Sequence, residues 1–411
     1  MQYIITAPAA LNCTVKLPAS KSISNRALII NALAGGNTIP ENLSDCDDTD
    51  VIIKALKDNP EEIDIKAAGT AMRFMTAYLA ATEGEHILTG TERMKHRPIA
   101  VLVDALRYLG AKIEYLGEEG YPPLRITGRK LWGRELHING NVSSQFISAL
   151  LMIGPTLRDK LELHLEGNII SRPYIDLTLW MMKEYGADAE WTDINVITVK
   201  PKPYTPRRYY IENDWSAASY WYEMMALSPT AEIELLGLFE DSLQGDAAGA
   251  KLFERLGVET QFTDRGVRLR HTGSCCRELT YDFVNEPDLE QTFVVTCALR
   301  GVPFRFTGLQ SLKIKETDRI AALQTELRKL GYVVRDEQDS ILSWDGERCE
   351  PEAHPVIATY EDHRMALSFA PAALVRPEGI EIAHPEVVSK SYPHYWADLR
   401  AAGFAVRTNE R

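Results

Sequence analysis

The sequence predicts an α/β fold assembled from copies of one unit that runs strand, helix, strand, helix, strand, strand. Two kinds of helix that alternate along the chain point to this fold. One kind is apolar on nearly all sides and starts with polar or charged residues, whereas the other is amphipathic and ends at a Leu-Gly or similar pair. Both kinds return at similar intervals, which is typical of internal repetition.

The apolar helices each follow a polar head. The first head, residues 18–26, leads into an apolar run that stops at Gly35 and Gly36. Because a helix that is apolar all round belongs in a core, we expect it to be buried. Further heads of the same design lie at residues 69–73, 143–146, 214–219, 287–291 and 362–366. We therefore expect six buried helices and six units.

The amphipathic helices follow strands that end at a glycine or a similar breaker. In the copy that ends at Gly331, Ile320, Leu323 and Leu327 have helical spacing. Strands at 124–127, 196–199 and 267–270 fill the gaps between helices. The copies span residues 87–111, 163–187, 235–258, 306–332 and 380–404, with a weaker one at 42–58. The first interval is short, so we expect the first unit to be trimmed and to lack a pair of strands.

Length and composition limit the possible partners. A chain of 411 residues exceeds the usual size of a single core, so we expect two domains. There is no apolar run long enough to span a membrane and no signal-peptide pattern at the N-terminus. The net charge of −13 argues against a nucleic-acid or anionic-membrane partner. A small anionic substrate stays possible if cations cluster locally.

Cofactor and metal motifs are missing from the sequence. None of the six cysteines forms a Cys-x-x-Cys pair and the histidines lack His-x-x-x-His spacing, so we expect neither a zinc site nor disulfides. Phosphate-loop and dinucleotide-binding glycine patterns are also missing, so ATP and dinucleotide binding have no motif support. A reducing, cytoplasmic setting fits this cysteine usage.

Cations gather at the helix heads, where the dipole disfavours them. In the cluster at residues 315–319, Thr317 can cap the following helix and Asp318 suits its first turn, but Arg319 makes sense if an anion is bound there. Arg364 likewise needs a partner, since an unpaired buried charge is costly. Solvation of each cation, and a capping role for Ser22, Ser24 or Asp288, are the simpler alternatives. The full set predicts sites for two ligands that bear phosphate or carboxylate groups: Lys21, Arg26, Arg97, Arg172, Lys315, Arg319, Arg364 and Lys390.

These stretches together resemble the 5-enolpyruvylshikimate-3-phosphate synthase family of enolpyruvyl transferases. The resemblance covers essentially the whole chain. Its motifs are Pro-x-Ser-Lys-Ser-x-Ser-x-Arg at 18–26, Gly-Thr-Ala-Met-Arg at 69–73, Arg-Met-Lys-x-Arg-Pro at 93–98, Val-Ser-Ser-Gln-Phe at 142–146, Ser-Arg-Pro-Tyr-Ile-Asp at 171–176, Lys-Glu-Thr-Asp-Arg at 315–319 and Asp-His-Arg-Met-Ala at 362–366.

The resemblance implies an inside-out array of six βαβαββ units in two domains, with helices inside and sheets outside. One domain would contain residues 1–18 and 215–411, and the other residues 19–214. The implied activity is transfer of the enolpyruvyl group of phosphoenolpyruvate to the 5-hydroxyl of shikimate 3-phosphate, with release of phosphate, in the shikimate pathway of aromatic amino acid biosynthesis. No metal or organic cofactor is implied. We expect a cytoplasmic monomer.

The resemblance also implies the site residues. Asp288, Glu316, Lys21 and Lys315 would be catalytic, with Asp288 near the hydroxyl and Glu316 near the methylene group. Shikimate 3-phosphate would be bound by Lys21, Ser22, Arg26, Ser143, Ser144, Ser171, Tyr174, Asp288, Ser311 and Lys315. Phosphoenolpyruvate would be bound by Lys21, Gly69, Arg97, Gln145, Arg319, Arg364 and Lys390.

The sequence departs from the family pattern at three positions. Ala67 and Phe74 stand where the family often has Asn and Pro, which bears on the phosphoenolpyruvate contacts and on glyphosate sensitivity. Ser311 stands where many members have Asn. Two alternative functions are left open by the sequence. A UDP-N-acetylglucosamine enolpyruvyl transferase would carry a cysteine in the loop at 90–97, where this chain has none. A non-catalytic anion-binding relative would not need Asp288, Lys315 and Glu316 together.

Overall fold

The computed structural model describes residues 1–36 and 39–409, which divide into two compact units. Unit 1 comprises Met1–Pro18 and Glu212–Arg411, and unit 2 comprises Ala19–Ile211. The first division falls at the expected place, and the second lies three residues before the expected boundary between residues 214 and 215. Each unit has its own hydrophobic core.

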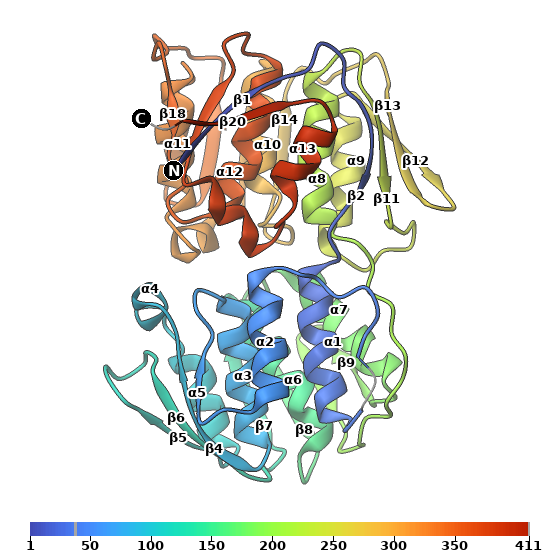
Figure 1. The fold of residues 1–411 in the computed structure, drawn as a ribbon. Coiled ribbons are helices and arrows are strands. Elements are labelled where there is room, and N and C mark those ends of the chain that lie inside the picture. The colour runs from blue at the N-terminus through green and yellow to red at the C-terminus, as the bar shows by residue number, and fades with distance from the viewer. Residues whose placement is uncertain (37–38, 410–411) are drawn as a thin grey trace. The chain divides into compact units, whose positions relative to one another are not determined.

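Unit 2 contains most of the N-terminal half of the chain (Figure 1). Its helices are α1 (Lys21–Leu33), α2 (Asp47–Asp58), α3 (Gly69–Ala81), α4 (Glu92–Lys95), α5 (Ala100–Tyr108), α6 (Ser144–Ile153), η1 (Gly154–Thr156) and α7 (Arg172–Glu184). Its strands are β3 (Glu62–Asp64), β4 (Gly84–Thr89), β5 (Lys112–Tyr115), β6 (Leu124–Gly128), β7 (Glu135–Asn139), β8 (Leu161–Glu166), β9 (Ala189–Asp193) and β10 (Val196–Val199).

Unit 1 combines the N-terminal segment with the C-terminal half. Its helices are α8 (Trp215–Leu227), η2 (Gly245–Ala247), α9 (Ala248–Glu254), α10 (Glu290–Arg300), η3 (Gln310–Ile314), α11 (Arg319–Lys329), α12 (His363–Phe369), η4 (Ala370–Leu374), η5 (Pro385–Lys390) and α13 (Tyr395–Ala401). Its strands are β1 (Gln2–Thr6), β2 (Asn12–Lys16), β11 (Glu232–Leu236), β12 (Val258–Thr263), β13 (Gly266–His271), β14 (Leu279–Asp282), β15 (Phe304–Thr307), β16 (Arg335–Glu337), β17 (Ile341–Trp344), β18 (Val356–Ile357), β19 (Ile380–Ala383) and β20 (Ala405–Asn409).

In the described residues, the strands form five four-stranded sheets of one topology. The orders are β3-β4-β6-β5, β7-β8-β10-β9, β2-β11-β13-β12, β14-β15-β17-β16 and β18-β19-β1-β20. The first two strands of each order run parallel, and the other neighbours run antiparallel. The expected unit of strand, helix, strand, helix, strand, strand and the α/β class are therefore confirmed.

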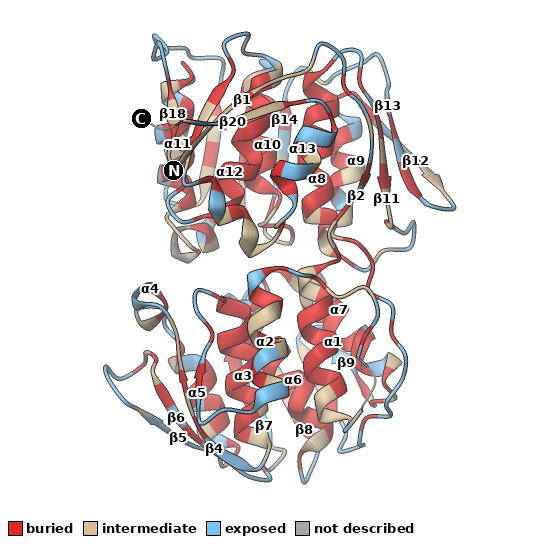
Figure 2. Ribbon diagram, in the orientation of Figure 1, coloured by how far each residue is buried: buried red, intermediate tan, exposed pale blue. Residues whose placement is uncertain are grey.

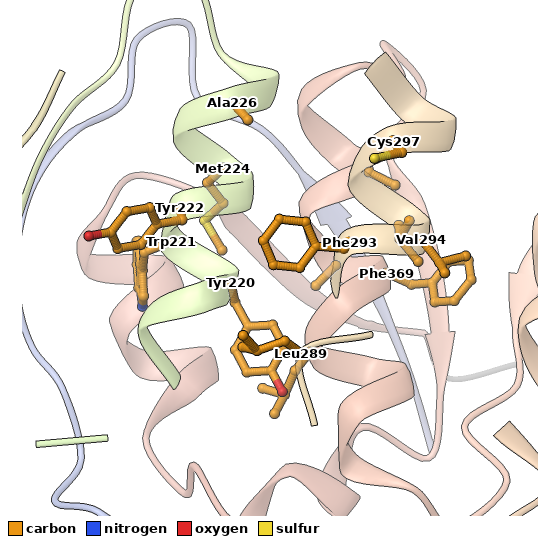
Figure 3. Packing of buried hydrophobic residues seen from close by; sticks show 14 of the residues in the cluster. Tyr220, Trp221, Tyr222, Met224, Ala226, Leu289, Phe293, Val294, Cys297 and Phe369 are labelled. Atoms are coloured by element: carbon orange, nitrogen blue, oxygen red, sulfur yellow. The ribbon is translucent and has the colours of Figure 1, made fainter. Parts of the chain in front are cut away.

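The six apolar helices form the interior of the two units, as expected. In unit 2, α1, α3 and α6 pack against one another, and in unit 1 α10 packs against both α8 and α12. Figure 2 shows these helices as mostly buried ribbons, and every residue of α12 is buried. Figure 3 shows how α8 and α10 meet in unit 1, with Met224 and Tyr220 facing Phe293 and Leu289.

The first repeat is trimmed further than the sequence suggested. It consists of α1 and α2, and within residues 1–36 and 39–409 it has no sheet of its own, only a parallel bridge between Glu41 and Tyr210. With no sheet to cover it, α2 keeps a polar face towards solvent, where Asp50 and Lys54 form an exposed ion pair. No helix in the described part of the chain is long and apolar enough to cross a membrane.

Candidate active site

Arg319 is the centre of a buried charge network in unit 1. It is the first residue of α11, and its side chain is 1% exposed. Its Nε lies 2.8 Å from Oδ2 of Asp362, and its two terminal nitrogens lie 3.0 Å from Oε2 of Glu316 and 3.2 Å from Oδ1 of Asp288. Burial favours the neutral guanidine, but the three carboxylates outweigh it and hold the pKa of Arg319 above its usual value.

Asp288 is shared between two helix heads. Besides Arg319, it accepts a 2.8 Å hydrogen bond from Nη2 of Arg364 in α12, and Nζ of Lys315 lies 3.7 Å away. Arg364 also donates a 3.0 Å hydrogen bond to the hydroxyl of Tyr220 in α8. Asp288 does not cap α10, which starts at Glu290, so the capping interpretation of this residue is wrong.

Glu316 joins the network to the end of η5. Its Oε1 accepts a 2.8 Å hydrogen bond from Nζ of Lys390, while Oε2 contacts Arg319. The loop that precedes α11 therefore brings Lys315 and Glu316 next to residues from three other segments. Both side chains keep some solvent exposure, 27% for Lys315 and 14% for Glu316, so a small ligand can reach them.

The buried cations Arg319 and Arg364 have partners within the protein. Arg319 and Arg364 were expected to need a bound anion, but Asp288, Glu316 and Asp362 already supply buried negative charge. Four cations, Lys315, Arg319, Arg364 and Lys390, face these three carboxylates, which leaves a net positive charge for a ligand. Asp318, and not Thr317, caps α11 by accepting from the backbone N–H of Ala321.

Two titratable groups in this region have altered proton affinity. Burial lowers the pKa of Lys315, which brings its ammonium closer to the range where it can give up a proton. Glu290, at the start of α10, is fully buried, and this burial raises its pKa to about 8. Glu290 is not conspicuous in the sequence, because a carboxyl group in the first turn of a helix is usually explained by a favourable interaction with the helix dipole.

In unit 2, two arginines flank Gly69 at the start of α3. A Cβ atom on this glycine would lie 2.6 Å from Nη1 of Arg97 and 2.7 Å from Nη1 of Arg73, so a side chain there would collide with both. Nε of Arg97 is buried and bonds to no described residue. Two guanidinium groups beside the free N–H groups of a helix start favour an anion. Gln145 also lies at the start of α3, since its Nε2 donates a 3.1 Å hydrogen bond to Oγ1 of Thr70, the residue after Gly69.

Arg73 ends the motif at residues 69–73, and the structure gives it a supporting role that the motif alone does not indicate. Its Nη1 donates to the carbonyl of Gly69 at 2.8 Å, and its guanidinium lies 5.4 Å from the centre of the Phe146 ring. The side chain therefore supports the backbone at the point where α3 begins. The signal that could have found it is its position one helical turn after Gly69.

Lys21 is paired within unit 2. It is the first residue of α1, and its Nζ lies 3.3 Å from Oδ2 of Asp48, a buried residue of α2. Ser22 is the next residue of α1, while the N-cap is Ser20 and not Ser22 or Ser24. The sequence does not single out Asp48 as the partner of Lys21, because Asp48 is one of several acidic residues in the first turn of α2, where acidic residues are common.

Arg26 is held inside the core of unit 2. It donates to Thr178 Oγ1 at 2.7 Å, to the carbonyl of Ser22 at 2.9 Å and to Ser148 Oγ at 3.1 Å. Its guanidinium lies 5.3 Å from the centre of the fully buried Phe74 ring. Burial lowers the pKa of Arg26 to about 10. The structure thus gives Arg26 a set of neutral protein acceptors, and it places Phe74 in the core.

The remaining expected residues lie at the starts of α6 and α7 or in η3. Ser143 caps α6 by accepting from the N–H of Gln145, and Ser144 is the buried first residue of that helix. Ser171 precedes α7 with a left-handed backbone (φ 53°), and the carbonyl of Tyr174 accepts from Arg26 at 3.3 Å. Ser311 is half-buried in η3.

Arg172 differs from the other cations of the expected set. Its guanidinium stacks on the ring of Trp191 at 4.0 Å, and its Nη1 donates to the carbonyl of Ile194 at 3.1 Å. The structure therefore directs Arg172 to the edge of its own sheet. It does not place Arg172 with Arg97 and Gln145.

Comparison with known proteins identifies the family. The family model of EPSP synthase (3-phosphoshikimate 1-carboxyvinyltransferase) matches residues 5–59 and 57–399. A 3-phosphoshikimate 1-carboxyvinyltransferase of Bacteroides fragilis is 63% identical over 410 residues, covering 100% of both chains. One from Tolumonas auensis is 36% identical over 94% of this chain and 96% of its own.

Solved structures agree on the fold. EPSP synthase from Acinetobacter baumannii superposes with a TM-score of 0.78 at 21% identity, covering 100% of both chains. The enolpyruvyl transferase NikO from Streptomyces tendae gives 0.73 at 17% identity over 99% of this chain and 98% of its own. With both the family model and full-length relatives in agreement, the chain belongs to the EPSP synthase (3-phosphoshikimate 1-carboxyvinyltransferase) family.

Proposed function

We propose that the buried network around Arg319 and the cationic group around Gly69 serve one reaction, the transfer of the enolpyruvyl group of phosphoenolpyruvate to the 5-hydroxyl of shikimate 3-phosphate. This is the activity of the family to which the chain belongs, a transferase step of the shikimate pathway that supplies aromatic amino acid biosynthesis. The observation that carries the proposal is the set of contacts among Asp288, Glu316, Arg319 and Lys390.

Phosphoenolpyruvate carries a phosphate and a carboxylate, and both need cations. We assign to it Lys21, Arg97, Arg319, Arg364 and Lys390, with Gln145 as a neutral donor and Gly69 as the position that admits the ligand. Support comes from the two guanidinium groups that approach Gly69 and from the excess of cations over carboxylates near Arg319. Clustered cations orient the ligand and stabilise the phosphate as it leaves.

Shikimate 3-phosphate presents a phosphate, a carboxylate and hydroxyl groups. We assign to it Asp288, Lys315 and Ser311 in unit 1. In unit 2 we assign to it Lys21, Ser22, Arg26, Ser143, Ser144, Ser171 and Tyr174. The helix starts of α1, α6 and α7 support this assignment, since these helices pack against one another and begin with hydroxyl side chains. Arg26 contributes by fixing Ser22 and Tyr174 through their carbonyls.

The reaction needs proton transfer at two atoms. Asp288 accepts the proton of the 5-hydroxyl as that oxygen bonds to the enol carbon, and Glu316 or Lys315 delivers a proton to the methylene carbon. Loss of phosphate then returns a proton from the methyl group to the same residue, which restores the enol double bond, and the proton held by Asp288 leaves with the phosphate. Lys315 suits the donor role because burial lowers its pKa. Lys21 neutralises the charge that develops on the phosphate.

A phosphate-release assay tests the function. The chain should release phosphate when shikimate 3-phosphate and phosphoenolpyruvate are present together, and not when either is present alone. Release with UDP-N-acetylglucosamine in place of shikimate 3-phosphate would support the alternative transferase, and specific binding without release would support the non-catalytic relative. The names of the full-length relatives favour the first outcome.

The setting of the enzyme is part of the proposal. We propose that it acts as a monomer on small anionic substrates without a cofactor, and that it does so in the cytoplasm. The six cysteines, which are all free, support a reducing compartment. Gel filtration with light scattering at several concentrations checks the monomer.

A further inference from the structure

The outer face of unit 2 carries two histidines side by side on neighbouring strands. Strands β7 and β8 are parallel and pair in a register that places His137 opposite His164 and Glu135 opposite Glu162. Along each strand the alternate residues, such as Leu136 and Leu163, are buried in the core. The pleat therefore turns the imidazole and carboxylate side chains to the same, solvent-facing side.

The polar atoms of this group converge. The two imidazole rings are stacked with their centres 4.7 Å apart. Oε1 of Glu135 lies 3.0 Å from Nε2 of His137 and 3.7 Å from Nε2 of His164. One ligand atom from each of these three residues lies within 4.8 Å of the others. A tetrahedral ion with bonds of about 2.0–2.1 Å needs ligand atoms about 3.3 Å apart, and the distances from Glu135 to the two histidines lie on either side of this value.

The surrounding carboxylates have the positions that support a metal site. Nδ1 of His137 lies 3.1 Å from Oε1 of Glu166, which orients the ring and leaves Nε2 turned towards Glu135. A carboxylate behind a metal-binding histidine is the usual second shell, because it fixes the tautomer and strengthens the ligand. Oε1 of Glu162 lies 3.1 Å from Nε2 of His164, within reach of the same ion.

We propose that Glu135, His137 and His164 bind a divalent transition-metal ion, with Glu162 as the fourth ligand and Glu166 orienting His137. Two imidazoles and carboxylates suit Zn²⁺, whereas Mg²⁺ requires an oxygen shell. The sequence did not reveal this site because its ligands come from two strands and lack local spacing. Strand β7 leads into the loop before α6, which begins at Ser144, and β8 leads into the loop before α7, which Ser171 precedes, so a bound ion would hold together the two strands behind these helix starts.

Calorimetric titration of the metal-free chain with ZnCl₂, in a buffer without phosphate or substrates, tests the proposal. We expect one saturable site and a rise in melting temperature with Zn²⁺, and neither effect with MgCl₂. His137→Ala and His164→Ala should each weaken Zn²⁺ binding at least about 10-fold, and Glu166→Gln by about 10-fold. His384→Ala is the matched control, because His384 is exposed and has one carboxylate partner, Glu386, at 3.2 Å.

The proposal is overturned if the wild-type chain shows no saturable Zn²⁺ binding, or if His137→Ala/His164→Ala binds as tightly as wild type. X-ray absorption of the zinc-loaded wild-type chain keeps the test decisive if the variants fold poorly. Nitrogen and oxygen ligands with imidazole scattering are expected. Sulfur ligands, which would come from the free cysteines, would contradict the assignment.

Discussion

Asp362 and Arg319 form an ion pair in which both side chains are at most 1% exposed, with Oδ2 and Nε 2.8 Å apart. The same carboxylate caps α12, since its Oδ1 accepts a 2.9 Å hydrogen bond from the backbone N–H of Arg364. One buried group thus links the first residue of α11 to the start of α12. The position of Arg364 depends on this link as well as on its own contacts.

Removing Asp362 should therefore destabilise unit 1 as well as disturb the site. We expect Asp362→Ala to lower the free energy of unfolding by about 3–5 kcal/mol, because Arg319 loses a buried partner. Asp362→Asn should be milder, since the amide oxygen can still cap α12. Urea unfolding followed by tryptophan fluorescence measures both losses. Equal stability of Asp362→Ala and wild type would show that the ion pair contributes nothing net.

Phosphoenolpyruvate binding should depend on Arg364 and Lys390 more than shikimate 3-phosphate binding does. We expect Arg364→Ala or Lys390→Ala to weaken phosphoenolpyruvate binding by about 2–4 kcal/mol, the scale for loss of one member of a desolvated charge pair. Arg172→Ala is the control, because that side chain stacks on Trp191. Calorimetric titration with each ligand separately provides the comparison, and equal losses for both ligands would refute the assignment.

Turnover should depend on Glu316 and Asp288. Glu316→Gln keeps the shape of the side chain but cannot transfer a proton, so we expect a loss in kcat of at least about 100-fold, and the same for Asp288→Ala. Circular dichroism should show an unchanged fold. A variant that turns over at nearly the normal rate would take that residue out of the proton-transfer mechanism.

Arg26 should matter for stability even without substrate. Arg26→Ala removes the guanidinium that donates to Thr178 and Ser148 and opens a cavity beside Phe74, so we expect a loss of about 2–4 kcal/mol in the free energy of unfolding. Arg26→Lys should not restore it, because lysine lacks the planar fork that reaches several acceptors. Arg97→Ala, at a half-buried loop position, should leave the melting temperature of the ligand-free chain nearly unchanged. Similar melting temperatures for Arg26→Ala and wild type would mean that Arg26 serves substrate binding alone.

Glu290 should make the chain less stable as the pH rises. Its carboxyl group stays protonated in the folded chain up to a pKa of about 8, while the unfolded chain loses this proton near 4.5. Between these values the unfolded state binds fewer protons, so wild type loses up to about 1.4 kcal/mol per pH unit relative to Glu290→Gln.

Urea unfolding of wild type and Glu290→Gln at pH 5, 6, 7 and 8 measures how the stability difference between them changes with pH. Glu254→Gln, at an exposed position of α9, serves as the control and should parallel wild type. If the stability difference between wild type and Glu290→Gln does not change with pH, the group is ionised in the folded state.

The repeats were predictable because each one has a recognisable hydrophobic pattern within a short stretch of sequence. An apolar stretch behind a polar head fixes a buried helix such as α3 or α8, and a period-two pattern fixes a strand such as β10. The trimmed first repeat was visible as a short interval. Its missing sheet was not, since an absent strand leaves no sequence pattern of its own.

The contacts among site residues were much harder to predict. Lys315, Glu316 and Arg319 could be singled out, because cations at a helix start are unusual. Their partners could not, since Arg319 meets Asp288 and Asp362 across 31 and 43 residues. Only the packing of α10, α11 and α12 brings these carboxylates together. The same reason hid the pairing of Lys21 with Asp48.

The way in which unit 1 is split along the chain has a consequence for synthesis. Its strand β2 pairs with β11, and β1 lies between β19 and β20, with Gln2 opposite Asn409. The polypeptide between residues 19 and 211 is continuous, so unit 2 can fold while translation proceeds. Strand β2 must wait until β11 has been synthesised, and β1 must wait until β19 and β20 have been synthesised. The sheet β18-β19-β1-β20 of unit 1, the unit that holds Arg319 and Asp362, is therefore completed only after β20 has been synthesised.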